Sequence, residues 1–181
     1  MTTFVALLRG VNVGKAKRVR MAELRAMLAG LGYTGVATLL NSGNAVFRAH
    51  KGTPAQHAAK IAAAVATSLA VEVPVIVKSS TELTSIVTGN PLAFSTADHS
   101  RLLVAFAQDA TSLADLVAIR SLVAPPEQFA MGRHAAYLLC ASGILGSRAG
   151  EALLGKAARM VTTRNWATVL RLQALVDKGG A

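Results

Sequence analysis

Residues suited to binding an anion gather in three polar segments, each placed where an apolar run ends. Glycine and short polar side chains leave backbone N–H groups accessible, and Lys or Arg adds positive charge, a combination that favours a phosphate or carboxylate. The candidate ligand-binding residues are Arg9, Gly10, Asn12, Gly14 and Lys15 in the first segment, Ser42, Gly43 and Asn44 in the second, and Thr162, Thr163, Arg164, Asn165 and Trp166 in the third.

The first segment joins an apolar run to a predicted helix and continues into further cations. A loop of this kind presents backbone donors and positive charge to a phosphate. Three residues separate Gly10 from Gly14, and Ala16 follows Lys15, whereas the nucleotide-hydrolysing P-loop needs four residues between its glycines and a Ser or Thr after the Lys. The segment therefore predicts a phosphate-bearing ligand without that kind of hydrolysis, and a solvated basic loop is the alternative.

The other two segments have structural alternatives of their own. Asn and Gly tolerate the backbone angles of a tight turn, so a hairpin alone explains residues 41–44. In the third segment a Thr is expected to cap a helix, and this helix N-terminus, with Arg164 and the Trp166 indole beside it, could hold an anion or stack a base. The alternative is that Trp166 belongs to an apolar core stripe with Val169, Leu170 and Val176.

The histidines, carboxylates and cysteine of the sequence lack the spacing typical of a catalytic site. The four histidines are dispersed without metal-ligand spacing, so neither a metal nor a cofactor is predicted. The nine carboxylates form no paired motif. The sole cysteine, Cys140, lies in an apolar run and is expected to be inert packing.

Composition indicates a folded, strongly basic chain. Of 181 residues, 52% are hydrophobic, which is ample for a core and excludes a disordered protein. The formal net charge of +10 favours an anionic partner. Residues 1–90 carry 10 basic and 3 acidic side chains against 9 and 6 in residues 91–181, so the first half is the expected electrostatic footprint.

The cysteine count and the apolar stretches of the sequence indicate the cellular compartment. A single cysteine cannot form an intramolecular disulfide, which favours a reducing environment. The first residues read as a strand rather than a signal peptide, and Glu72 and Pro74 interrupt the most apolar stretch before it is long enough to cross a bilayer. We expect a cytoplasmic protein without a membrane partner.

Apolar periodicity predicts an α+β protein built from two ferredoxin-like βαββαβ units, an arrangement that suggests internal duplication, with an additional C-terminal helix. The division is expected near residue 90, giving units at 1–90 and 91–181. Strands are expected at 3–9, 36–40, 45–47, 73–77, 102–107, 128–131, 135–141 and near 160–161, and helices at 21–31, 53–69, 81–88, 111–122, 148–158 and 164–176.

Several of these motifs occur together in one known family. The run from Leu8 to Lys15, then Met21-Ala22-Glu23-Leu24, Ser42-Gly43-Asn44 and the residues from Thr162 to Trp166 resemble the bacterial family called domain of unknown function 1697. The resemblance implies a two-part α+β fold of ferredoxin-like units and no established activity. In the first loop this chain has Lys15, Ala16, Lys17 and Arg18 where family members usually carry a second Gly and often an Asn.

The leading hypothesis is a binding protein for an anionic ligand, either a nucleic acid or a nucleotide-like, phosphate-bearing small molecule, bound through the basic Gly-rich loop and a helix N-terminus. The alternative is a small-molecule enzyme with its active site in the cleft between the two halves, where ligand pockets commonly lie. A homo-oligomer or scaffold is a third hypothesis, and the sequence leaves the oligomeric state open.

Overall fold

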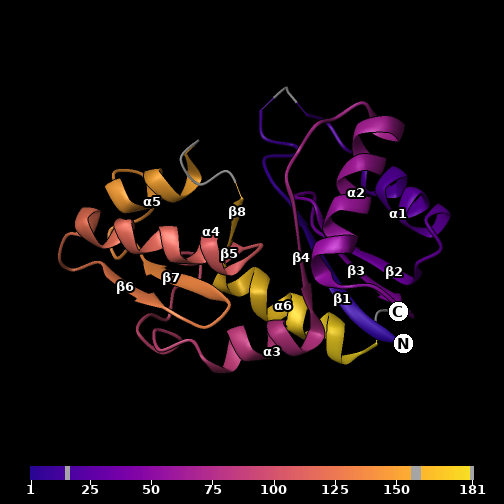
Figure 1. The fold of residues 1–181 in the computed structure, drawn as a ribbon. Helices are drawn as coiled ribbons and strands as arrows, with labels where there is room; N and C mark the ends of the chain where they lie inside the picture. Colours follow the sequence, from indigo (N-terminus) through magenta and orange to yellow (C-terminus); the bar gives the residue numbers. More distant parts are fainter. Residues whose placement is uncertain (15–16, 156–159, 180–181) are drawn as a thin grey trace. The chain divides into compact units, whose positions relative to one another are not determined.

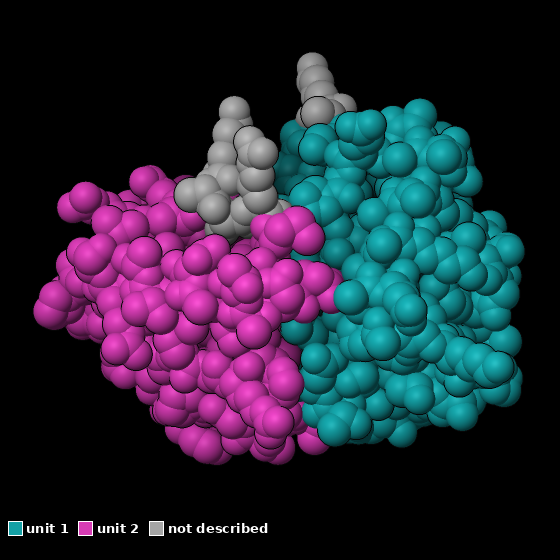
Figure 2. All heavy atoms as spheres, in the orientation of Figure 1, with its two compact units in different colours: residues 1–83, 172–181 teal, residues 84–171 magenta. Residues whose placement is uncertain are grey.

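The computed structural model describes residues 1–14, 17–155 and 160–179. It divides into two compact units, residues 1–83 with 172–181, and residues 84–171 (Figure 2). The elements of the first half are β1 (Thr2–Leu8), α1 (Met21–Gly30), β2 (Thr34–Leu39), β3 (Asn44–Ala49), α2 (Pro54–Leu69), β4 (Val75–Ser79) and α3 (Ser80–Thr88) (Figure 1). Those of the second half are β5 (Leu102–Ala107), α4 (Ala110–Asp115), a 3₁₀ helix at Leu116–Leu122, β6 (Gln128–Met131), β7 (Ala135–Leu139), α5 (Arg148–Leu154), β8 (Val161–Asn165) and α6 (Trp166–Asp177).

The first sheet has the strand order β2-β3-β1-β4, in which β1 is central and pairs antiparallel with β3 and β4. Phe4, Ala6 and Leu8 of β1 pack in one core with residues of both helices, among them Leu24 of α1 and Ile61 of α2. The intervening residues of β1 are also buried. Burial on both faces explains why this strand reads as a continuous apolar run rather than an alternating one.

Local signals fix the start and end of α2. Thr53 forms a capping box with Gln56: the Thr53 hydroxyl accepts from the Gln56 backbone N–H, and the Gln56 side chain accepts from the Thr53 N–H. Pro54 occupies the first turn, where its missing N–H costs nothing. At the other end Ala70 adopts a left-handed conformation. The expected helix at 53–69 is therefore confirmed.

The second sheet repeats this topology with the order β6-β7-β5-β8. Its core includes Leu103 of β5, Leu138 of β7 and Leu153 of α5. The helix expected at 111–122 is instead a short α-helix continued by a 3₁₀ helix. Leu116 and Ile119 lie three residues apart, so a 3₁₀ turn places both on the side that faces the core. The two-unit ferredoxin-like prediction is confirmed in strand order and pairing.

The end of the chain differs from the expectation. Residues 161–165 form β8, in register with β5, so Thr162, Thr163 and Arg164 are strand residues rather than the start of a helix. The helix begins at Trp166 because the Asn165 side-chain oxygen accepts from the Thr168 N–H (2.9 Å). The expectation of a Thr cap beside Arg164 was wrong, since pairing with β5 extends the strand up to the capping Asn165.

A helix follows the fourth strand in both halves: α3 follows β4, and α6 follows β8. The repeat of element order thus includes the helix that the sequence suggested as a C-terminal addition. No helix among the described residues has the length and apolar character needed to span a bilayer.

Candidate functional site

The loop between β1 and α1 meets the turn between β2 and β3. The Leu8 N–H donates to the Gly43 carbonyl (2.8 Å). Gly43 has a φ of +76°, and a Cβ atom built there would lie 2.7 Å from both the Leu8 Cβ and a Val11 methyl. Glycine is needed at residue 43 for its conformation and for this close approach. Two of the three polar segments therefore come together in space.

Asn12 joins the two segments through its side chain. Its amide nitrogen donates to the carbonyls of Val19 (2.8 Å) and Asn41 (2.7 Å), and its amide oxygen accepts from the Val19 N–H (2.9 Å). Asn12 itself has a left-handed φ of +57°, a conformation that Asn tolerates better than most residues. These three bonds occupy both ends of the amide, so Asn12 is a positioning residue rather than a ligand contact.

A surface pocket of about 680 Å³ lies beside this junction, at the N-terminus of α1. Its charged lining comes from Arg18 and Arg20, both exposed. Arg20 occupies the N-cap position, and its side chain makes no capping hydrogen bond. The pocket is lined by Asn12, Arg18, Val19, Arg20, Met21, Ala22 and Asn41.

Electrostatics in this pocket favour an anion. The N–H groups of the first helical turn have no intrahelical acceptor and carry the positive end of the helix dipole. The Glu23 carboxylate lies 3.9 Å from the Arg20 guanidinium. The two side chains are 84% and 52% exposed, so this ion pair is weak and leaves the positive potential of the pocket largely intact.

The remaining candidates of the first segment have different environments. Arg9 is half-buried, its N–H donates to the Pro74 carbonyl (2.9 Å), and burial lowers the pKa of its guanidinium. Gly10 and Gly14 have φ values of +67° and +63° with open space where a side chain would be. Lys15 lies outside the described residues.

The second segment forms the expected hairpin turn. Asn44 is fully buried, and its amide donates to the Leu39 carbonyl and to the Ser42 hydroxyl, both at 2.9 Å. These bonds are internal to the turn, as the hairpin interpretation requires. From this turn the exposed residue Asn41 lines the pocket instead.

The third segment belongs to residues 84–171, the second unit, and its side chains are largely inaccessible. Arg164 is 9% exposed, and its guanidinium donates to the Thr162 hydroxyl (2.9 Å) and the Thr163 carbonyl (2.7 Å). Burial lowers the pKa of Arg164 to about 10. Trp166 is 3% exposed, which fits the core alternative better than stacking on a ligand.

The structure adds residues that the sequence candidates omitted. Arg18 and Arg20 line the pocket, whereas the candidate set of the first segment ended at Lys15. The available signal was the position of these two cations directly before a predicted helix. Within the described ranges, no cluster of three or more His, Cys, Asp or Glu side chains has a geometry that would hold a metal ion.

Comparison with known proteins identifies a family and a similar structure. A family model described as protein of unknown function (DUF1697) matches residues 1–137. The chain belongs to the DUF1697 family. A conserved bacterial protein from Streptococcus pneumoniae shares the fold, with a TM-score of 0.75 and 24% sequence identity over 97% of this chain and 98% of that chain. None of the curated proteins compared with the chain matches it.

The residues that match the DUF1697 model include the whole candidate site beside α1. The loop, the turn and every residue that lines the α1 pocket fall within residues 1–137, whereas the third segment, residues 162–166, lies beyond the matched range. The family description assigns no activity.

Proposed function

We propose that this protein binds an anionic, phosphate-bearing ligand, a nucleic acid or a nucleotide-like metabolite, in the pocket at the N-terminus of α1. The observation that carries the proposal is the pocket of about 680 Å³, in which Arg18 and Arg20 flank an N-terminus without a side-chain cap. Guanidinium groups pair with phosphate oxygens in bidentate geometry, and helical N–H groups supply further donors.

The frame of the pocket supports this role. Asn12 holds the Val19 backbone and the Asn41 carbonyl, so the residues on either side of the pocket are joined before any ligand arrives. Preorganisation of this kind lowers the entropy cost of binding. Arg18 and Arg20 are adjacent to Val19, which fixes the backbone from which both cations extend.

The distribution of charge points to the same unit. Residues 1–83 and 172–181 contain 11 Lys and Arg against 4 Asp and Glu, a formal charge of +7, while residues 84–171 contain 8 against 5, a formal charge of +3. An excess of positive charge raises the local concentration of anions and their association rate. Together with the single, buried Cys140, this fits a cytoplasmic role with a nucleotide or nucleic acid.

The test is a fluorescence-anisotropy titration of a labelled 12-nucleotide single-stranded RNA, with unlabelled ATP and duplex DNA as competitors, at about 50 and 200 mM salt. An extrinsic label is needed because Trp166 is buried in the second unit. We expect Arg18→Gln/Arg20→Gln to weaken binding at least about tenfold, as expected when two charge-assisted contacts are lost.

The matched control is Arg120→Gln/Arg133→Gln, which removes the same charge from exposed positions of the second unit. This control should bind with an affinity close to that of the unmodified protein. If both double variants weakened ligand binding equally, the loss of affinity would follow from net charge alone, and the assignment of the pocket would be overturned. A steep salt dependence would identify a polynucleotide, and effective competition by ATP at both salt concentrations would identify a nucleotide.

A further inference from the structure

His57 of α2 lies buried in an aromatic cluster of the first unit. Its side chain is 5% exposed, and its ring centroid lies 4.5 Å from that of Phe4, 5.5 Å from Phe47 and 5.3 Å from Tyr33. The Tyr33 hydroxyl and the His57 Nδ1 are 2.8 Å apart. A basic group therefore lies among apolar rings, and its side-chain partner, the Tyr33 hydroxyl, is neutral.

The other ring nitrogen of His57 determines which tautomer is present. Nε2 is buried without a hydrogen-bond partner. It faces Gly52, where a Cβ atom would approach the His57 Nε2 to 2.8 Å. The Lys51 backbone also interacts with the imidazole and favours its charged form. Because a phenol hydroxyl is a good donor to a neutral imidazole nitrogen, we assign Nδ1 as the acceptor and the Tyr33 hydroxyl as the donor, which puts the proton of the neutral ring on Nε2. The neutral ring therefore satisfies the buried hydroxyl.

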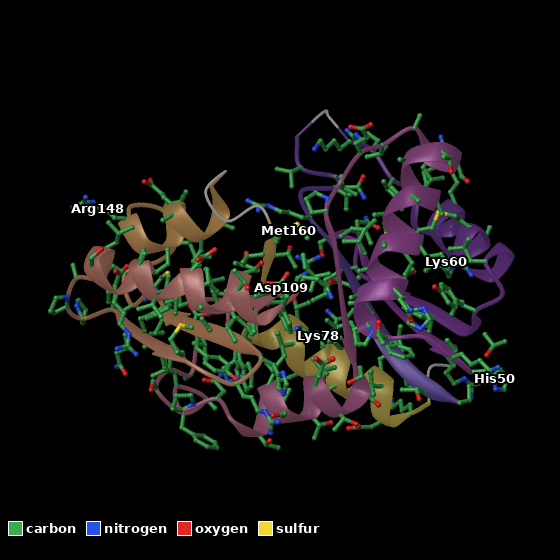
Figure 3. The ribbon with its side chains drawn as sticks, in the orientation of Figure 1. His50, Lys60, Lys78, Asp109, Arg148 and Met160 are labelled. Atoms are coloured by element: carbon green, nitrogen blue, oxygen red, sulfur yellow. The ribbon has the colours of Figure 1, made fainter. Side chains whose placement is uncertain are left out.

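The Tyr33 contact connects two helices. Tyr33 lies three residues after the end of α1, and its N–H donates to the Leu28 carbonyl (3.3 Å). Lys60, one turn beyond His57 in α2, donates from Nζ to the Leu31 carbonyl (2.9 Å) and lies 5.2 Å from the centre of the Tyr33 ring. Figure 3 shows Lys60 on α2. Tyr33 and Lys60 therefore each connect α2 to the segment that follows α1.

Burial and the charge of Lys60 oppose a positive charge on His57. The described groups that face it are the phenol of Tyr33, the ammonium of Lys60 on its own helix and the Lys51 carbonyl, while β1 and β3 contribute the uncharged rings of Phe4 and Phe47. Burial, and then the charge of Lys60, lower the pKa of His57 below its ordinary value of 6.5, and the Lys51 carbonyl offsets this in part. The Tyr33 hydroxyl can turn to accept a proton from Nδ1, but the buried charge stays uncompensated.

We propose that His57 makes the attachment of α1 to α2 sensitive to pH: the neutral ring holds Tyr33 against α2, and protonation drives this contact open. Protonation favours the open form, in which the imidazolium reaches water. The contribution of neutral His57 to stability is present above pH 6.5 and is lost as the pH falls below that value. The reason is that the pKa of His57 is lower in the folded protein than in the unfolded chain. The device would respond to mild acid in the range where histidine titrates.

The experiment is amide hydrogen exchange of the full chain at pH 7.5 and pH 5.0, corrected for intrinsic rates and read in peptides that cover residues 28–34 and 53–60. Relative to pH 7.5, protection should fall at pH 5.0 by up to about 30-fold, the limit set by 1.5 pH units below the ordinary pKa of 6.5. His57→Asn, which keeps a hydrogen-bond acceptor and cannot become charged, should remove this pH dependence. The matched control is His50→Asn, because His50 is exposed and should leave the pH dependence intact.

A second variant keeps the test decisive if His57→Asn fails to fold. Tyr33→Phe keeps the ring packing but removes the hydroxyl that stabilises neutral His57, so the pKa of His57 in the folded protein should rise toward 6.5 and the fall in protection between pH 7.5 and pH 5.0 should become smaller. The proposal is overturned if protection in these peptides is the same at both pH values, if His57→Asn retains the dependence, or if Tyr33→Phe leaves the size of the fall in protection unchanged.

Discussion

The Asn12 side-chain nitrogen lies 2.7 Å from the Asn41 carbonyl oxygen, a hydrogen bond between residues 29 positions apart in the sequence. With the two bonds to Val19, it connects the loop before α1 to the β2–β3 turn. The pocket beside α1 owes its shape to this junction, because Asn12 and Asn41 both line it.

Asn12→Ala should destabilise the protein and weaken ligand binding together. Three hydrogen bonds are lost, and the Val19 N–H and carbonyl lose partners in a half-buried position, so we expect a decrease of about 2–3 kcal/mol in the free energy of unfolding. Urea denaturation measures this change. Asn41→Ala is the control, because the bond from Asn12 is to the backbone carbonyl of Asn41 and survives the substitution. Equal destabilisation by the two variants would contradict the role given to the Asn12 amide.

Gly43→Ala should be more damaging than Gly14→Ala. Both residues have positive φ, so each substitution introduces backbone strain of about 1 kcal/mol. Only at Gly43 does the added methyl also meet neighbours, at 2.7 Å from Leu8 and Val11. Thermal unfolding should show a clearly lower Tm for Gly43→Ala, and similar Tm values would mean that the turn and the loop are not in contact in solution.

Arg164→Ala should change stability without changing ligand affinity. Arg164 is buried and bonded to Thr162 and the Thr163 carbonyl, so its removal leaves buried acceptors and a cavity, with an expected loss of about 2–4 kcal/mol. Arg171→Ala, at an exposed position, should stay within about 0.5 kcal/mol of the unmodified protein. Chemical denaturation and the RNA titration together measure both effects. Loss of binding by folded Arg164→Ala would return the third segment to the ligand site.

Cys140 should resist thiol reagents in the folded protein. Its side chain is fully buried, and burial raises the pKa of the thiol, although a hydrogen bond with Ser147 acts in the opposite direction. Both protonation and inaccessibility slow the reaction, because the thiolate is the nucleophile. Ellman's reagent at pH 8 should therefore react only when denaturant is added, and rapid labelling of the native protein would contradict the packing around β7.

Much of the fold could be predicted from local signals. Thr53 and Pro54 predict the start of α2, and the apolar run of β1 is typical of a strand buried on both faces. The family resemblance was confirmed by the match over residues 1–137, which contains all of the motifs that carried it except residues 162–166. The boundary expected near residue 90 stays a prediction about where the chain divides into folding units.

The site was harder to predict because it depends on pairing between distant residues. Neighbouring positions of β1 and β3, such as Leu7 and Asn44, bring the β2–β3 turn to the end of β1, and only then can Asn12 reach Asn41. The end of the chain was misassigned for a similar reason. Thr162 and Thr163 suit either a helix cap or a strand, and pairing with β5 selects the strand.

The most direct test of the central claim is a ¹⁵N–¹H correlation spectrum of the full chain titrated with ATP at low salt. Binding at the proposed site predicts saturable shifts of the amides of residues 20–23, where the first turn of α1 lines the pocket, and loss of these shifts in Arg18→Gln/Arg20→Gln. Shifts confined to other parts of the chain, or saturable binding that leaves residues 20–23 unmoved, would contradict the claim.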